Sequence, residues 1–341
     1  MIDNFAGNRP VVRALERTIA QDRIPQTLLL YGLEGVGKAT LARRFAAALV
    51  GNGDKIEQDD LSLPQNVEML AEREKLASED RAEDPLVLAT HPDFLTFPPD
   101  GPLRQISIQQ MRLLKERAQY APLKGRRRVF LVDQLDRANE QAANSLLKTL
   151  EEPPDHLVLV LTAGNVYDLL PTIRSRAVPF YLAPLALEEM REFARVRGLK
   201  QAERRIALAD GSPGLAVSLD LEAYDKRREA MLALLEAGSR QTPFSAWAPY
   251  AERLAAARSE KLEPYLRVLY LLLEDMVRLQ EGQEEIRNGD ILGRLEALAA
   301  RVSFDWIQAA VKQVDELVQF VRRNVQKSLA LDALVVALRA A

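Results

Sequence analysis

A glycine-rich stretch that directly follows an apolar run is the part of the sequence best suited to chemistry. It reads Gly32-Leu33-Glu34-Gly35-Val36-Gly37-Lys38-Ala39-Thr40 and comes after Thr27-Leu28-Leu29-Leu30-Tyr31. Glycines of this kind let backbone N–H groups converge on phosphate oxygens, and the N-terminus of a following helix adds a favourable dipole. Lys38 would place a positive charge near the β- and γ-phosphates of a nucleotide. We therefore predict that Gly32, Gly35, Gly37 and Lys38 bind phosphate, and we include Thr40 and Asp133 among the candidate nucleotide-binding residues.

Residues that nucleotide hydrolysis normally needs are missing near this loop. The position after Lys38 calls for a hydroxyl that ligates Mg²⁺ but holds Ala39, and the nearest hydroxyl, on Thr40, lies about 100° around the helix. Asp133 ends a second apolar run, where a carboxylate would hold the metal through water. The residue after it, often a glutamate base, is Gln134, whose amide cannot usefully accept a proton. We predict binding of ATP or ADP with weak Mg²⁺ dependence and without hydrolysis; the alternative is that Asp136 replaces the base.

The elements that must position these residues follow from the apolar pattern. Continuous apolar runs at 27–31, 128–133 and 157–162 predict strands of a parallel sheet covered on both faces, and helical patterns at 38–50 and 138–150 lie between them. Residues 51–90 are rich in Asp and Glu, so we expect an insertion that is helical around 68–76 and otherwise mobile. After Pro184 the chain turns helical, and a stripe of Ile307, Val311, Val314, Val318 and Val321 is typical of an amphipathic helix.

Composition excludes several classes of protein. The 341 residues include no Cys, which rules out disulfides within the chain and cysteine-ligated zinc, and two His are too few for an imidazole-rich metal site. No apolar run reaches the ~18–20 residues of a membrane span, and the N-terminus lacks the pattern of a secretory signal. A net charge of −3 argues against a uniformly basic surface for nucleic acid. We expect a cytoplasmic protein without zinc and without membrane association.

Further motifs extend over nearly the whole chain. They are Phe5-Ala6-Gly7-Asn8, Arg23-Ile24-Pro25, His91-Pro92-Asp93, Ile106-Ser107-Ile108-Gln109-Gln110-Met111-Arg112, Ala142-Ala143-Asn144-Ser145-Leu146-Leu147-Lys148-Thr149-Leu150-Glu151-Glu152-Pro153-Pro154, Leu170-Pro171-Thr172-Ile173-Arg174-Ser175-Arg176, Gly211-Ser212-Pro213-Gly214, and Asn324-Val325-Gln326 with Leu329-Ala330-Leu331. The run from Ala142 to Pro154 is the most specific of them. Together with the loop they resemble the delta-prime subunits of the bacterial DNA polymerase III clamp loader, which belong to the AAA+ superfamily.

The resemblance implies a fold, an assembly and partners. It implies an α/β AAA+ P-loop domain with a parallel sheet over residues 1–182, including the insertion 51–90, then a small helical lid over 183–221 and an all-α collar domain over 222–341. Clamp loaders of this family are five-subunit machines that open the ring-shaped sliding clamp and place it on primed DNA. The implied partners are the tau or gamma and delta subunits, with the clamp and primer–template DNA reached through the complex. The chain would then be a component of the polymerase III holoenzyme rather than an enzyme on its own.

The same resemblance implies roles for single residues. Ser175 and Arg176 match the pair whose arginine, an arginine finger, acts in the ATP site of a neighbouring tau or gamma subunit; Ala177 replaces the Cys that commonly follows. In hydrolysing relatives the lid carries an arginine at the position of Gly214, so this glycine also argues against hydrolysis. Many relatives carry four zinc-binding cysteines after the first helix of the loop, and residues 51–90 contain none.

Two points stay open from the sequence. The competing function is a catalytically active AAA+ ATPase, either a tau- or gamma-like loader subunit or a homo-oligomeric motor. The basic cluster Lys124-Gly125-Arg126-Arg127-Arg128 could touch DNA phosphates, although a charge run is usually a solvated face. We interpret His91 and His156 as structural residues.

Overall fold

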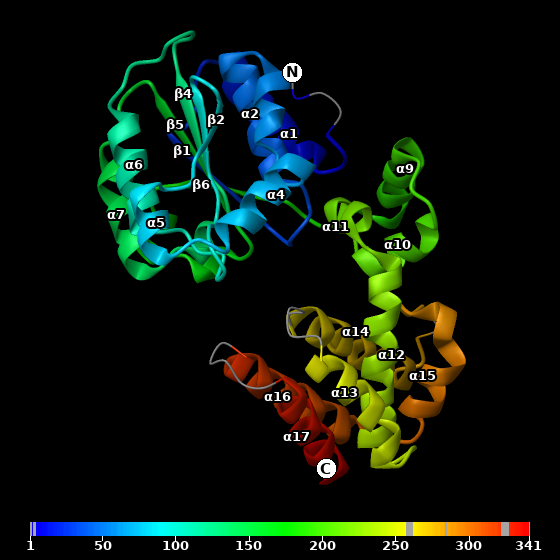
Figure 1. Ribbon diagram of the computed structural model, residues 1–341. Coiled ribbons are helices and arrows are strands. Elements are labelled where there is room, and N and C mark those ends of the chain that lie inside the picture. Colours follow the sequence, from blue (N-terminus) through cyan, green and yellow to red (C-terminus); the bar gives the residue numbers. More distant parts are fainter. Residues whose placement is uncertain (1, 3–4, 257–261, 284, 322–326, 341) are drawn as a thin grey trace. The chain divides into compact units, whose positions relative to one another are not determined.

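The computed structural model describes residues 2, 5–256, 262–283, 285–321 and 327–340 (Figure 1). The chain divides into two compact units. The first comprises Met1–Ala202 with Ala209–Val217, and the second comprises Glu203–Leu208 with Ser218–Ala341. The residues that we expected to form a separate lid, 183–221, are thus shared between the two units. The lid as a domain of its own stays a prediction.

A sheet lies at the centre of the first unit. In the described residues it has six strands in the order β2-β3-β4-β5-β1-β6. Their bounds are β1 Thr27–Tyr31, β2 Leu88–His91, β3 Phe94–Phe97, β4 Arg128–Val132, β5 Leu157–Ala163 and β6 Val178–Tyr181. Neighbouring strands are parallel except β2, which runs antiparallel to β3. The three predicted strands are confirmed as β1, β4 and β5, whereas β2, β3 and β6 were not foreseen.

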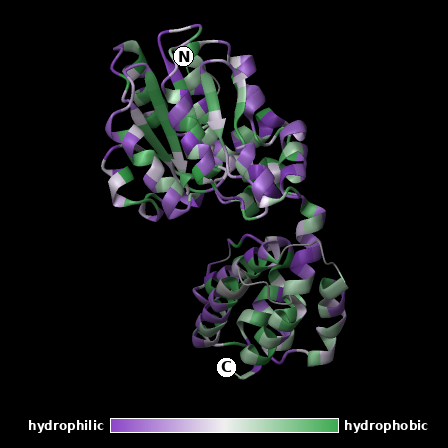
Figure 2. Ribbon diagram, turned by 60° about the vertical axis from the view of Figure 1, so that its left-hand side comes forward, coloured by the Kyte–Doolittle hydropathy of each residue, from purple (hydrophilic) through white to green (hydrophobic). Residues whose placement is uncertain are grey.

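Helices cover both faces of this sheet (Figure 1). Helices α1 (Arg9–Ala20) and α2 (Lys38–Val50) pack on one face, and α6 (Ile108–Ala118) and α7 (Glu140–Glu151) pack on the other. Leu28 and Leu30 of β1 belong to the same buried cluster as Phe45 of α2, while Leu29 belongs to the cluster that contains Leu146 of α7. The central strands β1, β4 and β5 therefore need apolar side chains on both sides, which is why they are among the most hydrophobic segments in Figure 2. The α/β fold with a parallel sheet is confirmed.

The acidic segment 51–90 contains more regular structure than we expected. It forms α3 (Gly53–Ile56), a short 3₁₀ turn at Glu57–Asp59, α4 (Pro64–Arg73) and α5 (Ser78–Glu83) before β2 begins. Buried polar contacts hold it against the core: the carboxylate of Asp59 accepts from the hydroxyls of Thr90 (2.6 Å) and Thr96 (3.1 Å). Composition alone misled us because a charged segment can be ordered by a few buried hydrogen bonds instead of by an apolar face.

The remaining helices complete both units. They are α8 Pro171–Arg174, α9 Leu187–Arg197, α10 Ala202–Ala209, α11 Pro213–Ser218, α12 Leu221–Gly238, α13 Ala248–Ala256, α14 Glu263–Gln280, α15 Leu292–Ala299, α16 Phe304–Val321 and α17 Lys327–Ala340. The second unit is all helical where it is described, with a core between α12, α14, α16 and α17. The predicted stripe lies on α16, where Ile307 and Val314 are buried and Val311 and Val318 are partly buried. The side chain of Val321 and the motif Asn324-Val325-Gln326 lie outside the described residues.

Candidate functional site

The glycine-rich loop lies at the carboxyl edge of the sheet, between β1 and α2. Gly32 leaves β1 with φ 147°, and a Cβ there would lie 2.2 Å from the carbonyl oxygen of Leu182. Gly35 and Gly37 have φ of 77° and 98°, the left-handed region that favours glycine. Helix α2 then begins at Lys38, and the first N–H groups of a helix have no helical partners. The loop predicted from the sequence is therefore built as a cradle in which backbone N–H groups can meet an anion.

The ammonium group of Lys38 is bound inside this loop. Its Nζ donates to the carbonyl oxygens of Gly32 (2.7 Å) and Leu33 (2.8 Å). Burial lowers the pKa of Lys38, and the negative charges of Asp133, Asp136 and Glu34 oppose that shift. The lysine is thus near both predicted acidic positions, and loop carbonyls satisfy two of its three donors.

The start of α11 rests directly on the loop. The hydroxyl of Ser212 donates to the carbonyl of Glu34 (2.7 Å), and the backbone N–H of Gly214 donates to the carbonyl of Gly35 (2.8 Å). A Cβ added to Gly214 would lie 2.8 Å from that same carbonyl oxygen. The backbone of Gly35 therefore leaves no room for a side chain at position 214 in this arrangement.

Asp133 directly follows β4 and is buried. The hydroxyl of Thr162 donates to its Oδ1 (2.5 Å), and the same hydroxyl accepts the backbone N–H of Gln134 (2.7 Å). Burial raises the pKa of Asp133, and the hydrogen bond from Thr162 opposes that shift. Asp136, our possible substitute for the base, faces the same region, since its charge acts on Lys38 and its Oδ1 is buried with no hydrogen-bond partner.

These residues fit a phosphate group better than a magnesium ion. The glycine cradle, the first turn of α2 and Lys38 supply N–H and ammonium donors for an anion. Ala39 offers no hydroxyl, Thr40 follows it in the first turn of α2, and burial favours the protonated form of Asp133. Within the described residues, no group of three or more His, Cys, Asp or Glu side chains is placed to hold a metal ion.

Arg176 is held at the end of α8. Its Nη1 donates to the carbonyl of Thr172 (2.9 Å) and to Oγ of Ser175 (3.2 Å), and its Nη2 donates to Oε1 of Glu151 (2.8 Å) at the end of α7. The side chain remains 34% exposed. A guanidinium has five N–H groups, so Nε and one N–H of Nη2 are left to meet a further acceptor. Glu151 was not predicted from the sequence as the partner that orients Arg176.

Arg176 and the loop lie at opposite ends of the parallel strands β1 and β6. Strands β1 and β6 are parallel, with Leu28 beside Val178 and Tyr31 beside Tyr181. Because Gly32 follows β1 and Arg176 precedes β6, one lies past the carboxyl ends of these strands and the other before the amino ends. The paired residues alone span about 10 Å. The structure therefore brings Lys38 and Asp133 together and keeps Arg176 apart from them.

The other candidates have structural partners. Arg128 is buried and donates to the carbonyls of Arg117 (2.6 Å) and Tyr120 (3.2 Å) at the end of α6. Arg127 pairs with Asp22 (2.7 Å), so Lys124 and Arg126 are the exposed cations of the basic cluster. A ring nitrogen of His156 lies 3.1 Å from the carbonyl of Ala118.

His91 is also enclosed in the fold. It is fully buried, and its Nδ1 accepts the backbone N–H of Asp93. Burial lowers the pKa of His91 and so favours its neutral form. Neither histidine belongs to the loop or to the end of α8.

No helix in the described ranges is both long and apolar enough to cross a bilayer.

A mostly parallel sheet with helices on both faces, a glycine-rich loop after β1 and an aspartate directly after β4 are the features of an α/β P-loop protein. The family described as "DNA polymerase III, delta subunit" matches residues 7–186, which is more than half of the chain. The chain therefore belongs to this family of clamp-loader subunits.

Individual relatives agree with this family. The chain is 32% identical over 207 residues to the delta-prime subunit of Pseudomonas aeruginosa, a match covering 59% of this chain and 57% of the relative. It is 31% identical over 231 residues to that of Escherichia coli, covering 66% of each. A gamma subunit from Buchnera aphidicola is 31% identical over 189 residues, covering 55% of this chain and 47% of the relative. The matches thus span about half to two thirds of these relatives.

Among solved structures, a gamma-subunit-related protein of Thermotoga maritima is similar with a TM-score of 0.45 and 21% identity, covering 96% of this chain and 98% of that one.

Proposed function

We propose that this chain is a delta-prime-like subunit of the clamp loader that does not hydrolyse ATP and supplies Arg176 to the ATP site of a neighbouring tau or gamma subunit. It would act in the cytoplasm during loading of the sliding clamp onto primed DNA. Delta is the further subunit partner that we propose, and the clamp and DNA would be reached through the assembled complex.

The position of Arg176 is the observation that carries this proposal. An arginine at the amino edge of the sheet cannot reach phosphates bound at the carboxyl edge of its own chain. It is instead partly exposed, with two N–H groups left for an acceptor. Ser175 supports the orientation, because its hydroxyl donates to Thr172 and accepts from Arg176. Such a guanidinium suits the charge that develops on a transferring phosphoryl group in another subunit.

The glycine-rich loop and its surroundings support the proposal that this chain does not hydrolyse ATP. Ala39 lacks a metal-binding hydroxyl, Gln134 lacks a basic carboxylate, and Gly214 has no side chain and is packed against the backbone of Gly35. A nucleotide would have to compete with the loop carbonyls for Lys38. Bound ATP or ADP would then stabilise the folded chain by mass action instead of driving a cycle.

Reconstitution of the complete loader tests the proposal. Arg176→Ala in this chain is expected to lower ATP turnover at least tenfold, toward the roughly 10³-fold of other arginine fingers. Arg176→Lys should recover little, since an ammonium does not reproduce the planar fork. Arg191→Ala, an exposed arginine on α9, is the control for loss of charge. Unchanged turnover with Arg176→Ala in a fully assembled loader would refute the role in trans.

The catalytic alternative has a separate test on the isolated chain. The proposal expects ATP turnover no higher than that of its Lys38→Ala variant, with and without Mg²⁺. Turnover well above that variant would assign hydrolysis to this chain, with Asp136 as the first candidate for the base. Light scattering separates the assemblies: we expect a monomer alone, and a stable homohexamer would favour the motor.

A further inference from the structure

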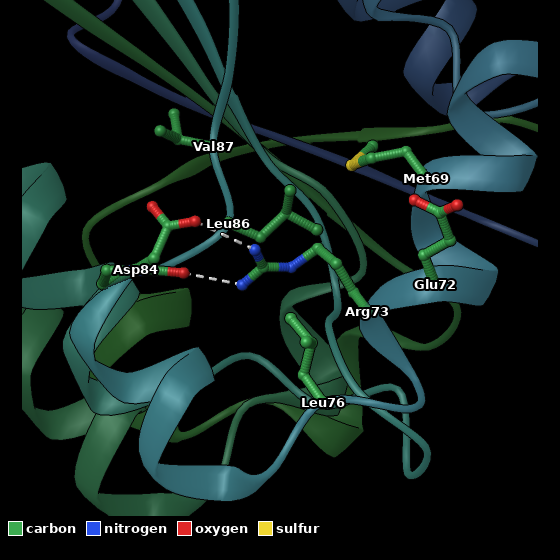
Figure 3. Close-up of a pocket in the computed structure, with 8 residues that line it drawn as sticks. Met69, Glu72, Arg73, Leu76, Asp84, Leu86 and Val87 are labelled. Atoms are coloured by element: carbon green, nitrogen blue, oxygen red, sulfur yellow. Dashed lines mark hydrogen bonds and ion pairs between the residues drawn. The ribbon is translucent and has the colours of Figure 1, made fainter.

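A cavity of about 390 Å³ opens within the acidic segment, between α4 and the chain that follows α5 (Figure 3). Its walls are mainly apolar, with carboxylates among them. The lining residues are Met69, Glu72, Arg73, Leu76, Asp84, Pro85, Leu86 and Val87. Leu76 is 42% exposed, so part of this apolar wall faces solvent. The cavity has no part in the nucleotide loop or the end of α8.

Buried hydrogen bonds fix the walls in place. Arg73 donates from Nη1 to the carboxylate of Asp84 (3.3 Å) and from Nη2 to its carbonyl (2.6 Å), which joins the two sides of the cavity (Figure 3). Its Nε and Nη2 also donate to the carboxylate of Asp100 (2.8 Å for Nη2), beyond the segment. On the far wall, the amide of Gln110 donates to the carbonyl of Leu86 (2.9 Å). The cavity is thus preformed and loses little freedom when it is filled.

The charge around the cavity is negative. Residues 68–87, which include all of the lining residues, contain seven Asp or Glu and three Lys or Arg. Glu74 pairs with Arg104, which lies outside this range. Two of the three cations within it are engaged: Arg73 as described, and Arg81 with the carbonyl of Leu76. Glu72 and Asp84 line the cavity itself. Phosphate backbones would be repelled here, so nucleic acid does not suit this surface, and a cationic partner does.

We propose that this cavity docks a basic segment of a partner protein, with apolar side chains inserted between Met69, Leu76 and Val87 and Lys or Arg side chains facing Glu72 and Asp84. The volume accommodates two side chains of about the size of leucine. Burial of those side chains would supply most of the affinity, while the carboxylates would raise the association rate and exclude acidic segments.

A defined peptide serves as the probe. The fluorescein-labelled hexapeptide Lys-Leu-Lys-Lys-Leu-Lys is titrated into the full-length chain, beside Lys-Ser-Lys-Lys-Ser-Lys and Glu-Leu-Glu-Glu-Leu-Glu. We expect the first peptide to bind at least tenfold more tightly than the serine peptide, since loss of one buried leucine alone is worth about tenfold. It should also bind more tightly than the glutamate peptide, whose carboxylates would face those of Glu72 and Asp84. Its binding should also protect backbone amides between residues 69 and 87 from hydrogen exchange.

Variants of the chain locate the site. Leu76→Ser and Glu72→Lys are expected to weaken binding at least fivefold, while Leu187→Ser and Glu188→Lys, the matched controls on α9, leave it unchanged. Circular dichroism melting confirms that each variant is folded. Equal binding of the serine peptide, or equal binding to Leu76→Ser, would mean attraction by charge alone and would overturn the proposal. Tight binding of a single-stranded oligonucleotide that Leu76→Ser weakens would overturn it too.

Discussion

At the scale of single residues, Asp133 shows a carboxylate placed where its ionisation is disfavoured. Its folded-state pKa lies above the roughly 3.9 of an unfolded chain. The folded chain therefore holds this proton to higher pH than the unfolded chain does, and the free energy of unfolding falls as the pH rises through that window. At neutral pH the group works against stability, which is common where a residue is kept for a site.

Asp133→Asn should consequently raise the melting temperature at pH 7 and change it less at pH 4, where both states of the wild type are closer to being protonated. The amide keeps an oxygen that accepts from Thr162, so the local hydrogen bond is retained. Calorimetry at the two pH values measures the difference. Asp168→Asn, at an exposed carboxylate, is the control and should show no such pattern. A lower melting temperature at pH 7 would contradict the assignment.

Glu151 is the residue that orients Arg176, and its removal has an expected cost. An ion pair between partly exposed groups is worth about 0–1 kcal/mol, so Glu151→Gln in the reconstituted loader should lower ATP turnover by no more than about fivefold. The loss should be smaller than with Arg176→Ala. Glu152→Gln, one residue further on, is the matched control. If Arg176→Ala lowers turnover and Glu151→Gln does not, the arginine needs no such partner.

At the scale of elements, the sequence predicts what is continuous and local. The apolar runs of β1, β4 and β5 and the helical pattern of α2 are confirmed, because burial on both faces and a 3.6-residue period leave clear patterns. Strand β6 was missed because Val178-Pro179-Phe180-Tyr181 is a short edge strand that carries a proline. The contact of Gly35 with Gly214 joins residues far apart in sequence, and no local pattern reports it.

That contact between the loop and α11 predicts a stability effect. A Cβ on Gly35 would lie 2.3 Å from Oγ of Ser212 and 2.9 Å from the backbone nitrogen of Leu215. Gly198 also has a left-handed φ (62°), but it has open space around its Cβ position. We expect Gly198→Ala to cost about 1 kcal/mol in urea unfolding and Gly35→Ala to cost at least about 1 kcal/mol more. Equal losses of unfolding free energy in the two variants would show that α11 moves away from the added Cβ at no energetic cost.

At the scale of the whole molecule, the first unit carries different groups at the two ends of its parallel strands. One end carries an anion cradle that is closed by α11 and lacks a metal-binding hydroxyl. The opposite end carries an oriented, partly exposed arginine. The proposed function uses this separation: Arg176 would complete a neighbour's site while the chain's own loop hydrolyses nothing, since the two sites share no side chain.

The contrast between these ends yields a prediction for the assembled loader. Lys38→Ala in this chain should leave ATP turnover of the complex within about twofold of wild type, because the proposed hydrolysis takes place elsewhere, whereas Arg176→Ala should lower it at least tenfold. Lys38 also bonds two loop carbonyls, so co-elution with the partner subunits must first show that the variant assembles. If an assembled Lys38→Ala loader lost most of its turnover, the cradle would be a working ATP site, and the missing hydroxyl, base and lid arginine would have substitutes among residues such as Asp136.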